Sequence, residues 1–196
     1  SHLISSELER GGTGRWIFLN DAMDTSIMIN EEDHIRASIL SSGFQSLTVH
    51  EKISQLEASI ESNLKMAYHT DFGYLTACPT NTGTGLRLSV MLHLPALVMT
   101  GQIEETLSGL SSYGLIVRGA YGEHSENIGD LYQISNEVTL GKSEADISRV
   151  LDRIVRQIVD REHLAREALF REAPVKIEDA ICRALGVLTM TRQIES

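Results

Sequence analysis

Three short segments of the sequence contain most of its chemically distinctive residues. They are "NEEDHIR" (30–36), "CPTNTGTGLR" (78–87) and "RGAYGEHSE" (118–126). Each segment combines an arginine with carboxylates, a cysteine or closely spaced glycines. Arginine is always charged and its planar fork of N–H donors matches phosphate oxygens, whereas glycine lets a backbone approach a ligand closely. The three segments therefore raise the hypothesis of a site for a negatively charged ligand.

Each segment taken alone also has a simpler structural explanation. Arg36 could be a surface arginine on a strand, and the acidic run 31–33 could be a solvated turn. Gly83 could serve only to supply a positive φ angle. Cys78 could be a buried small apolar residue, which is the usual fate of a free cysteine. For any single segment the structural explanation is the better one, so the functional hypothesis depends on their combination.

The composition of the chain limits the kinds of partner that it can bind. Its 196 residues are enough for one domain with a real core. The formal net charge of −10 argues against nonspecific binding to nucleic acid or to an anionic membrane. Arginines that bind a phosphate-bearing ligand must therefore be gathered locally, against the overall charge of the protein.

The cysteines and the apolar runs favour a reduced, cytoplasmic setting. Cys78 and Cys182 are far apart and lack CxxC spacing, so neither a zinc site nor a disulfide framework is expected. The segment "SHLISSELER" at the start has no apolar core flanked by basic residues, which argues against a signal peptide. The longest apolar run, 86–99, is interrupted by charged and polar residues and by a proline, and it is shorter than the ~20 residues of a membrane span.

Runs rich in β-branched and aromatic residues, and alternation of apolar and polar residues, predict the strands. The segments "RWIFLN" (15–20) and "TSIMIN" (25–30), with "DAMD" between them, predict a hairpin. Four further strands are predicted at 34–40, 86–94, 114–122 and 130–138. The strands lie too close together in sequence for repeated β–α–β crossovers, so the sheet is expected to be antiparallel.

Apolar residues spaced three or four apart predict the helices. The predicted helices are at 50–67, 103–110 and 143–170. Ser143 and Asp146 resemble a capping box at the start of the long helix, whose charged face is expected to be solvated. Pro174 ends that helix, and a second one is predicted at 177–185. Strands mostly precede helices, which predicts an α+β fold: a mainly antiparallel sheet flanked by helices, with a helical C-terminal portion.

Together and in this order, the three segments resemble the motifs of the guanidino-phosphotransferase (phosphagen kinase) family. The family motifs are N-E-E-D-H-x-R, C-P-[ST]-N-x-G-T-x-x-R and R-G-x-x-G-E-x-[ST]-E, and the resemblance extends over about residues 15–170. It implies a glutamine-synthetase-like catalytic domain at 1–172, followed by the start of a helical region at 173–196. It also implies transfer of a phosphoryl group from ATP, with Mg²⁺, to a guanidine.

Within the family, the sequence looks most like the bacterial protein-arginine kinases. Creatine and arginine kinases usually have a histidine where this chain has Met91, and a second arginine where it has Tyr121. The segments "HLPALV", "QISN" and "TLGKSE" also favour the protein-arginine kinases. That group phosphorylates arginine side chains of proteins and marks them for Clp proteolysis. The resemblance therefore implies protein substrates with exposed arginines, and it suggests an activator protein and a Clp protease as further partners.

The resemblance assigns the nucleotide-binding residues. They are Arg36, Arg87, Arg118, Met91, Asn81, Gly83 and Thr84. The three arginines are expected to contact the phosphates, and the loop residues to bring the backbone close to them. Met91 is expected to pack against the adenine, although core packing would explain it equally well. Mg²⁺ is expected to bridge phosphate oxygens and to keep water ligands, so no protein ligand is assigned to it.

The resemblance also assigns the residues that handle the acceptor guanidinium. Glu32 and Glu123 are expected to hold this cation, one acting mainly as the base and the other as a clamp. Cys78 is expected to lie near several arginines, which would favour its thiolate form. The thiolate would orient the guanidinium electrostatically and would not act as a nucleophile.

The sequence also departs from the family pattern, and these departures keep alternatives open. Family domains begin with a strand carrying S-x-R-x-R and two more nucleotide-binding arginines, so the domain at 1–172 is expected to lack its first strand. One alternative is a kinase for a small free guanidine such as arginine. A second is a non-catalytic regulatory module on the same fold. The apolar stripe on the last helices also allows a homodimer.

Overall fold

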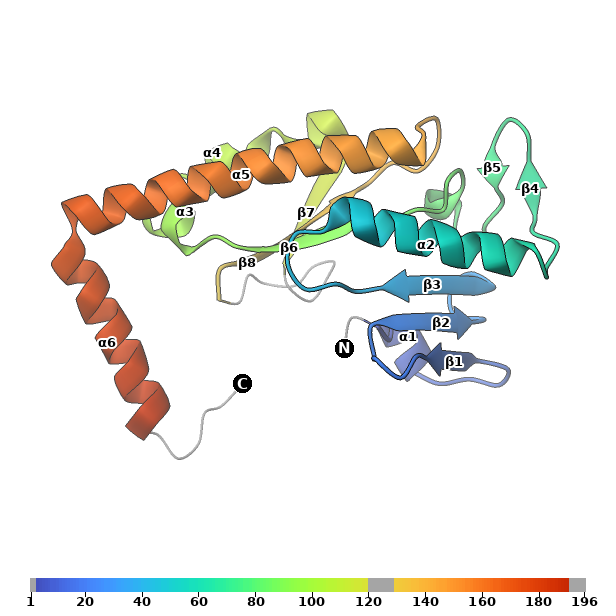
Figure 1. Ribbon diagram of the computed structural model, residues 1–196, viewed down its shortest axis with the longest axis horizontal. Helices are drawn as coiled ribbons and strands as arrows, with labels where there is room; N and C mark the ends of the chain where they lie inside the picture. The colour runs from blue at the N-terminus through green and yellow to red at the C-terminus, as the bar shows by residue number, and fades with distance from the viewer. Residues whose placement is uncertain (1–2, 120–128, 191–196) are drawn as a thin grey trace.

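In the described part of the chain, the strands form two three-stranded antiparallel sheets and one small hairpin, with long helices beside them (Figure 1). The computed structural model describes residues 3–119 and 129–190. All of the strand pairs in this part of the chain are antiparallel. This arrangement of sheets and helices confirms the predicted α+β class.

The first sheet contains β1 (Trp16–Leu19), β2 (Thr25–Ile29) and β3 (Ile35–Ile39) in sequence order. The predicted hairpin is confirmed, because β1 pairs with β2. The Asn20 side chain closes its turn by accepting hydrogen bonds from the amides of Asp24 (3.1 Å) and Thr25 (3.0 Å). The helix α2 (Ser46–Glu61) lies along β3, and the short α1 (Ser6–Glu9) lies near β1 and β2 (Figure 1).

The second sheet contains β6 (Ser89–His93), β7 (Leu115–Gly119) and β8 (Leu131–Asn136), with β8 in the centre. Alternation gives the sheet two unlike faces. One face carries apolar side chains such as Leu92 and Ile134, which belong to the main hydrophobic core. The other face carries more polar residues, and it is the face that concerns the site.

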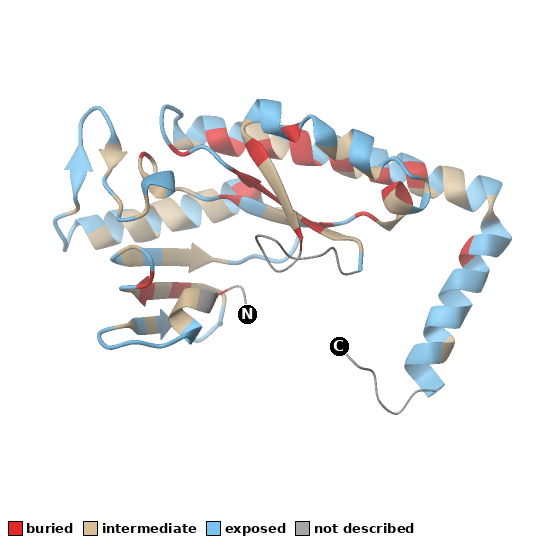
Figure 2. Cartoon of the chain, turned by 180° about the vertical axis from the view of Figure 1, so that it is seen from behind, coloured by how far each residue is buried: buried red, intermediate tan, exposed pale blue. Residues whose placement is uncertain are grey.

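The long helix α5 (Glu144–Glu172) completes the core. Its predicted apolar stripe is buried, including Leu151, Val155 and Ile158. Each such side chain contributes roughly 1.5–3 kcal/mol when it is fully removed from water. The predicted capping box is also confirmed, since the Ser143 hydroxyl accepts a hydrogen bond from the Asp146 amide at 3.1 Å. In Figure 2 the buried residues are concentrated along this helix and the sheet beneath it.

The remaining elements are short, apart from the last helix. They are the hairpin β4 (Tyr68–His69) and β5 (Gly73–Tyr74), the 3₁₀ turns η1 (Pro79–Asn81) and η2 (Leu110–Tyr113), and the helices α3 (Pro95–Met99), α4 (Ile103–Ser108) and α6 (Pro174–Met190). Figure 1 shows α6 leaving the end of α5 at a steep angle, and Figure 2 shows most of it exposed. No described helix is both long enough and apolar enough to cross a membrane.

Several boundaries differ from the sequence predictions for identifiable reasons. The helix predicted at 50–67 lies at 46–61, because the chain then turns into the β4–β5 hairpin, whose two-residue strands are too short for alternation to reveal. The long helix α5 ends just before Pro174, as predicted, but Pro174 also begins α6, and Pro95 likewise begins α3. A missing N–H costs little at the first position of a helix. The predicted strand at 114–122 is observed as β7 at 115–119, and residues 120–122 lie outside the described part.

The sequence predicted that the charged face of α5 would be solvated. The structure shows that this face is not entirely solvated. Glu162 is only 4% exposed. Its carboxylate accepts hydrogen bonds from the amides of Ala96 (3.1 Å) and Leu97 (3.0 Å) at the start of α3, and from Arg166 (2.6 Å). Glu162 therefore caps a helix that is remote in sequence, and it fixes the segment after β6 to α5.

Replacing Glu162 by glutamine should lower the free energy of unfolding by about 2 kcal/mol, because charge-assisted hydrogen bonds are lost in a buried place. Urea denaturation would measure this change. Glu167→Gln, at an exposed position of the same helix, is the matched control and should change stability by less than about 0.5 kcal/mol. Equal losses in both variants would contradict the capping role.

Candidate active site

The segment 30–36 forms the tight turn between β2 and β3. Asn30 has a positive φ of 53°, and its amide donates to the carbonyl of His34 at 2.9 Å. The three acidic residues of the turn have different environments: Glu31 is buried, Glu32 is exposed and Asp33 is half-buried. The turn is therefore not a uniformly solvated acidic loop.

Glu31 and Arg36 form an ion pair at the base of this turn. The Glu31 side chain is 2% exposed, and both of its oxygens lie 3.3 Å from Nη1 of Arg36. Burial acts to raise the pKa of Glu31, but hydrogen bonds from Ser5 and the Glu32 amide, together with the Arg36 charge, hold that pKa below its ordinary value. This contribution to stability is present above the unfolded pKa and is lost as pH falls through the folded pKa.

Arg36 keeps part of its guanidinium available despite this pairing. Its side chain is 47% exposed, whereas that of its partner Glu31 is almost completely buried. The buried Glu31 carboxylate therefore orients the Arg36 side chain. The guanidinium N–H groups of Arg36 that face solvent remain accessible to an anionic ligand.

Asp33 connects the turn to the segment 78–87. Its Oδ1 accepts a hydrogen bond from the Cys78 amide at 3.0 Å, and its Oδ2 accepts one from Nδ2 of Asn81 at 2.7 Å. Two segments that lie far apart in sequence are thus side by side. The exposed Glu32, adjacent to Asp33, is brought to the same region as Cys78, and its carboxylate makes no hydrogen bond to another described residue.

The segment 78–87 is held in place from its other side by Thr139. The Thr139 hydroxyl lies 3.0 Å from the Thr80 carbonyl and 2.7 Å from the Thr82 carbonyl, and the Thr139 carbonyl accepts from the Thr84 amide at 3.0 Å. The Gly83 amide donates to the carbonyl of Tyr74 at 3.1 Å. The main-chain N–H groups of Gly83 and Thr84 are therefore already used within the fold.

Cys78 lies at the beginning of this segment, immediately before η1. The residue is half-buried, and its Sγ lies 3.0 Å from the Thr80 hydroxyl. Its carbonyl accepts hydrogen bonds from the Thr76 hydroxyl and the Asn81 amide. The main chain of Cys78 is thus fixed on both its N–H and its C=O sides, which leaves the thiol as its chemically available group.

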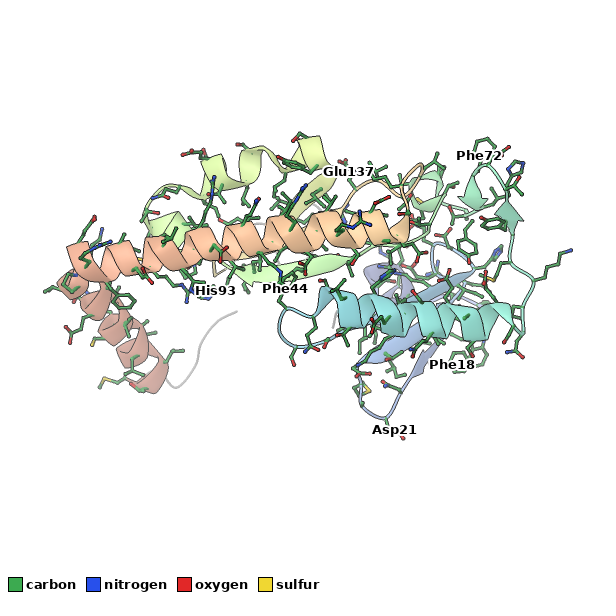
Figure 3. The ribbon with its side chains drawn as sticks, turned by 45° about the horizontal axis from the view of Figure 1, so that its top comes forward. Phe18, Asp21, Phe44, Phe72, His93 and Glu137 are labelled. Atoms are coloured by element: carbon green, nitrogen blue, oxygen red, sulfur yellow. The ribbon has the colours of Figure 1, made fainter. Side chains whose placement is uncertain are left out.

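Met91 and Arg118 lie in one row across the second sheet. Gln133 of the central strand pairs with Met91 on one side and with Arg118 on the other. Cross-strand partners share a face, so the three side chains lie on the face away from the core. Met91 is 37% exposed, so core packing does not account for it. His93, two residues further along β6, shares that face and lies beneath α5 in the view of Figure 3.

Five of the predicted site residues therefore fall into two groups, and the members of each group are linked to one another. Glu32, Cys78 and Asn81 are linked through Asp33, and Met91 and Arg118 are linked through the sheet. Arg87 is exposed, two residues before β6. Glu123 lies outside the described residues. The part of the chain that the structure describes has no group of three or more His, Cys, Asp or Glu side chains suited to holding a metal ion.

Several residues of the site were not singled out by the sequence. They are Glu31, Asp33, Gln133 and Thr139. The first two could be suspected because they flank Glu32, but nothing in linear spacing connects residue 33 to residue 78 or residue 139 to residue 83. These contacts depend on tertiary packing.

Comparison with known proteins shows similarity along the whole chain. It is 46% identical over 195 residues to the protein-arginine kinase of Bacillus subtilis (strain 168), a match that covers 100% of this chain and 53% of that protein. It is 47% identical over 195 residues to the protein-arginine kinase of Halothermothrix orenii, covering 100% of this chain and 56% of that protein. The chain thus spans about half the length of the curated relatives that it matches.

Solved structures of related kinases have a similar fold. The crystal structure of lombricine kinase matches with a TM-score of 0.73 and 30% identity, over 85% of this chain and 49% of that one. The duplicated taurocyamine kinase from Schistosoma mansoni, with bound components of a transition state analog, matches with a TM-score of 0.69 and 33% identity, over 81% of this chain and 22% of that one.

A family model gives the same assignment. Residues 1–165 match the C-terminal catalytic domain of the ATP:guanido phosphotransferases. This match includes all three motif segments, and it confirms the family predicted from them. The chain therefore belongs to the ATP:guanido phosphotransferase family.

Proposed function

We propose that the protein is an ATP-dependent protein-arginine kinase. The observation that carries the proposal is the similarity of 46–47% identity, over the entire chain, to proteins named protein-arginine kinase. The structures of lombricine and taurocyamine kinases are less similar, at 30% and 33% identity. A protein substrate is therefore favoured over a small free guanidine, and marking of the product for Clp-type proteolysis is part of the proposal.

Three arginines bind the nucleotide phosphates in this proposal: Arg36, Arg87 and Arg118. Transfer of the γ-phosphoryl group passes through a loose transition state, so the protein acts mainly by positioning and by neutralising charge. The half-exposed guanidinium of Arg36 fits this role. Met91 supports the adenine from the same sheet face as Arg118, through a sulfur–aromatic contact.

The loop residues contribute chiefly to the shape of the nucleotide site. The amides of Gly83 and Thr84 are engaged by Tyr74 and Thr139, and Asn81 donates to Asp33. The contacts with Tyr74 and Thr139 hold the loop that leads to Arg87 in one conformation, whether or not Asn81 is bound to Asp33. Mg²⁺, when bound with the nucleotide, would be held by phosphate oxygens and water and would neutralise phosphate charge.

The acceptor guanidinium is handled by Glu32, Glu123 and Cys78. A guanidinium has a pKa of ~12.5 or above, so its nitrogen is a poor nucleophile until a proton is removed. A carboxylate accepts this proton as the N–P bond forms, while the bond between the γ-phosphorus and the bridging oxygen of ADP breaks. The second carboxylate and the Cys78 side chain hold the cation in line.

The remaining parts of the proposal follow from the same family assignment. Residues 1–172 are the catalytic domain and 173–196 the start of a helical region, which is supported by the end of α5 at Glu172 and the exposed α6.

The protein is proposed to be cytoplasmic. Its partners are substrates with exposed arginines, an activator protein and a Clp protease. A homodimer is proposed from the exposed apolar residues of α6, such as Ile181 and Leu185.

The test is to incubate the protein with MgATP and either an arginine-rich protein or free arginine. We expect acid-labile phosphate on arginine side chains of the protein substrate, detected by mass spectrometry under neutral conditions, and at least about tenfold less with free arginine. Phosphorylation of free arginine alone would indicate the small-guanidine alternative. If neither product forms and calorimetry detects no binding of MgADP, the kinase proposal is contradicted and the regulatory module is favoured.

A further inference from the structure

The turn that contains Glu32 is held by the two acidic residues on either side of it. Glu31 points inward to Arg36, at 3.3 Å, and Asp33 points to the segment 78–87. Both flanking carboxylates are therefore used inside the fold, and only the middle one is exposed. The position of the Glu32 carboxylate depends on these two attachments, because an exposed side chain has little packing of its own.

Asp33 uses both of its oxygens on one short segment. Oδ1 binds the Cys78 amide at 3.0 Å and Oδ2 binds the Asn81 side chain at 2.7 Å. Hydrogen bonds to a carboxylate are shorter and stronger than neutral ones, and two on one group fix its orientation. The segment is also held independently by Thr139 and Tyr74. Loss of Asp33 would thus release the turn from the loop without unfolding the loop.

We propose that Asp33 is a positioning residue, which fixes the carboxylate of Glu32 relative to the thiol of Cys78. The inference rests on the proposed function, in which these two groups hold the acceptor guanidinium. The Glu32 carboxylate and the Cys78 thiol lie on separate loops. They can bind one planar guanidinium together only if the distance between the two loops is constant. Asp33 provides that constraint, while Asn81 is its partner on the other loop.

The test compares single and exchanged variants of the intact protein. Asp33→Ala should lower kcat/KM for the protein acceptor by about 10- to 100-fold, because small misplacements of reacting groups are costly, while the Kd for MgADP should change less than about twofold. Asn81→Asp should be at least as damaging, because two carboxylates then face each other. Asp33→Asn/Asn81→Asp exchanges donor and acceptor, and should recover about tenfold over Asn81→Asp alone.

A second measurement does not depend on catalysis. In a Cys182→Ser background, the rate of Cys78 alkylation by iodoacetamide should change by about threefold or more in Asp33→Ala, since the environment of the thiol is altered. Asp21→Asn is the control, because Asp21 is exposed at the tip of the β1–β2 hairpin (Figure 3) and should change neither readout.

The outcomes separate this inference from the proposed function. If the unmodified protein phosphorylates no guanidine, the kinase proposal fails, and the alkylation rates alone decide the role of Asp33. Unchanged alkylation and acceptor kinetics in Asp33→Ala would overturn the positioning role. Equal losses of acceptor and nucleotide binding, or no recovery in the exchanged variant, would indicate general structural damage and would overturn it as well.

Discussion

Glu32→Gln should lower kcat for arginine phosphorylation by about 10²- to 10⁴-fold, which is the usual contribution of a residue that accepts a proton in the transition state. Glutamine has nearly the same shape but can neither accept the proton nor attract the guanidinium by charge. The side chain is exposed and its carboxylate makes no hydrogen bond to another described residue, so folding should be unaffected, within about 0.5 kcal/mol. Steady-state kinetics with a protein substrate would measure the effect.

The controls for this variant separate chemistry from binding and from folding. The Kd for MgADP should be unchanged, because Glu32 is assigned to the acceptor. Glu51→Gln, at an exposed position on α2, removes a negative charge elsewhere and should leave kcat unchanged. Glu123→Gln, assayed across a range of pH, would show which carboxylate is the base. A Glu32→Gln variant that retains most of its kcat would exclude Glu32 from the acceptor site.

Most of the strands and the long helix could be predicted from the sequence, because their residue types and apolar patterns are typical of those elements. The hairpin at 15–30 follows from its β-branched and aromatic residues and the turn between them, and the stripe of α5 follows from apolar periodicity. The capping box gives the start of that helix. The β4–β5 hairpin could not be predicted in this way, since its strands contain two residues each. Its position depends on pairing with the segment 78–87, through Tyr74 and Gly83.

The site was predictable in its composition but not in its connections. Motif resemblance identified Glu32 and Cys78, whereas Asp33, which links them, could only be seen once the fold had brought the two loops together. Gly83 shows the same limit. Its residue type suggested an approach to phosphates, but the structure provides a different reason for glycine, namely the backbone of Thr139.

Gly83→Ala should destabilise the protein by about 3–5 kcal/mol, since a steric clash and an unfavourable backbone conformation act together. A Cβ atom at this position would lie 2.3 Å from the carbonyl oxygen of Thr139, 2.7 Å from its carbonyl carbon and 2.8 Å from Cα of Leu140. These are main-chain atoms, so no side chain can rotate away. The φ angle of +117° is also one that residues with a Cβ rarely adopt.

Gly85→Ala separates these two causes. Gly85 also has a positive φ, +63°, but the nearest atom to its Cβ would be the Asn81 carbonyl oxygen at 3.9 Å, an ordinary contact. It should therefore lose only the conformational part, about 1–2 kcal/mol. Urea denaturation would measure the free energy of unfolding of both variants, and the difference between their losses gives the cost of the steric clash. Equal losses of stability in the two variants would mean that the backbone of Thr139 can move aside. The close approach of Thr139 to the segment 78–87 would then not be what holds the loop before Arg87 in place.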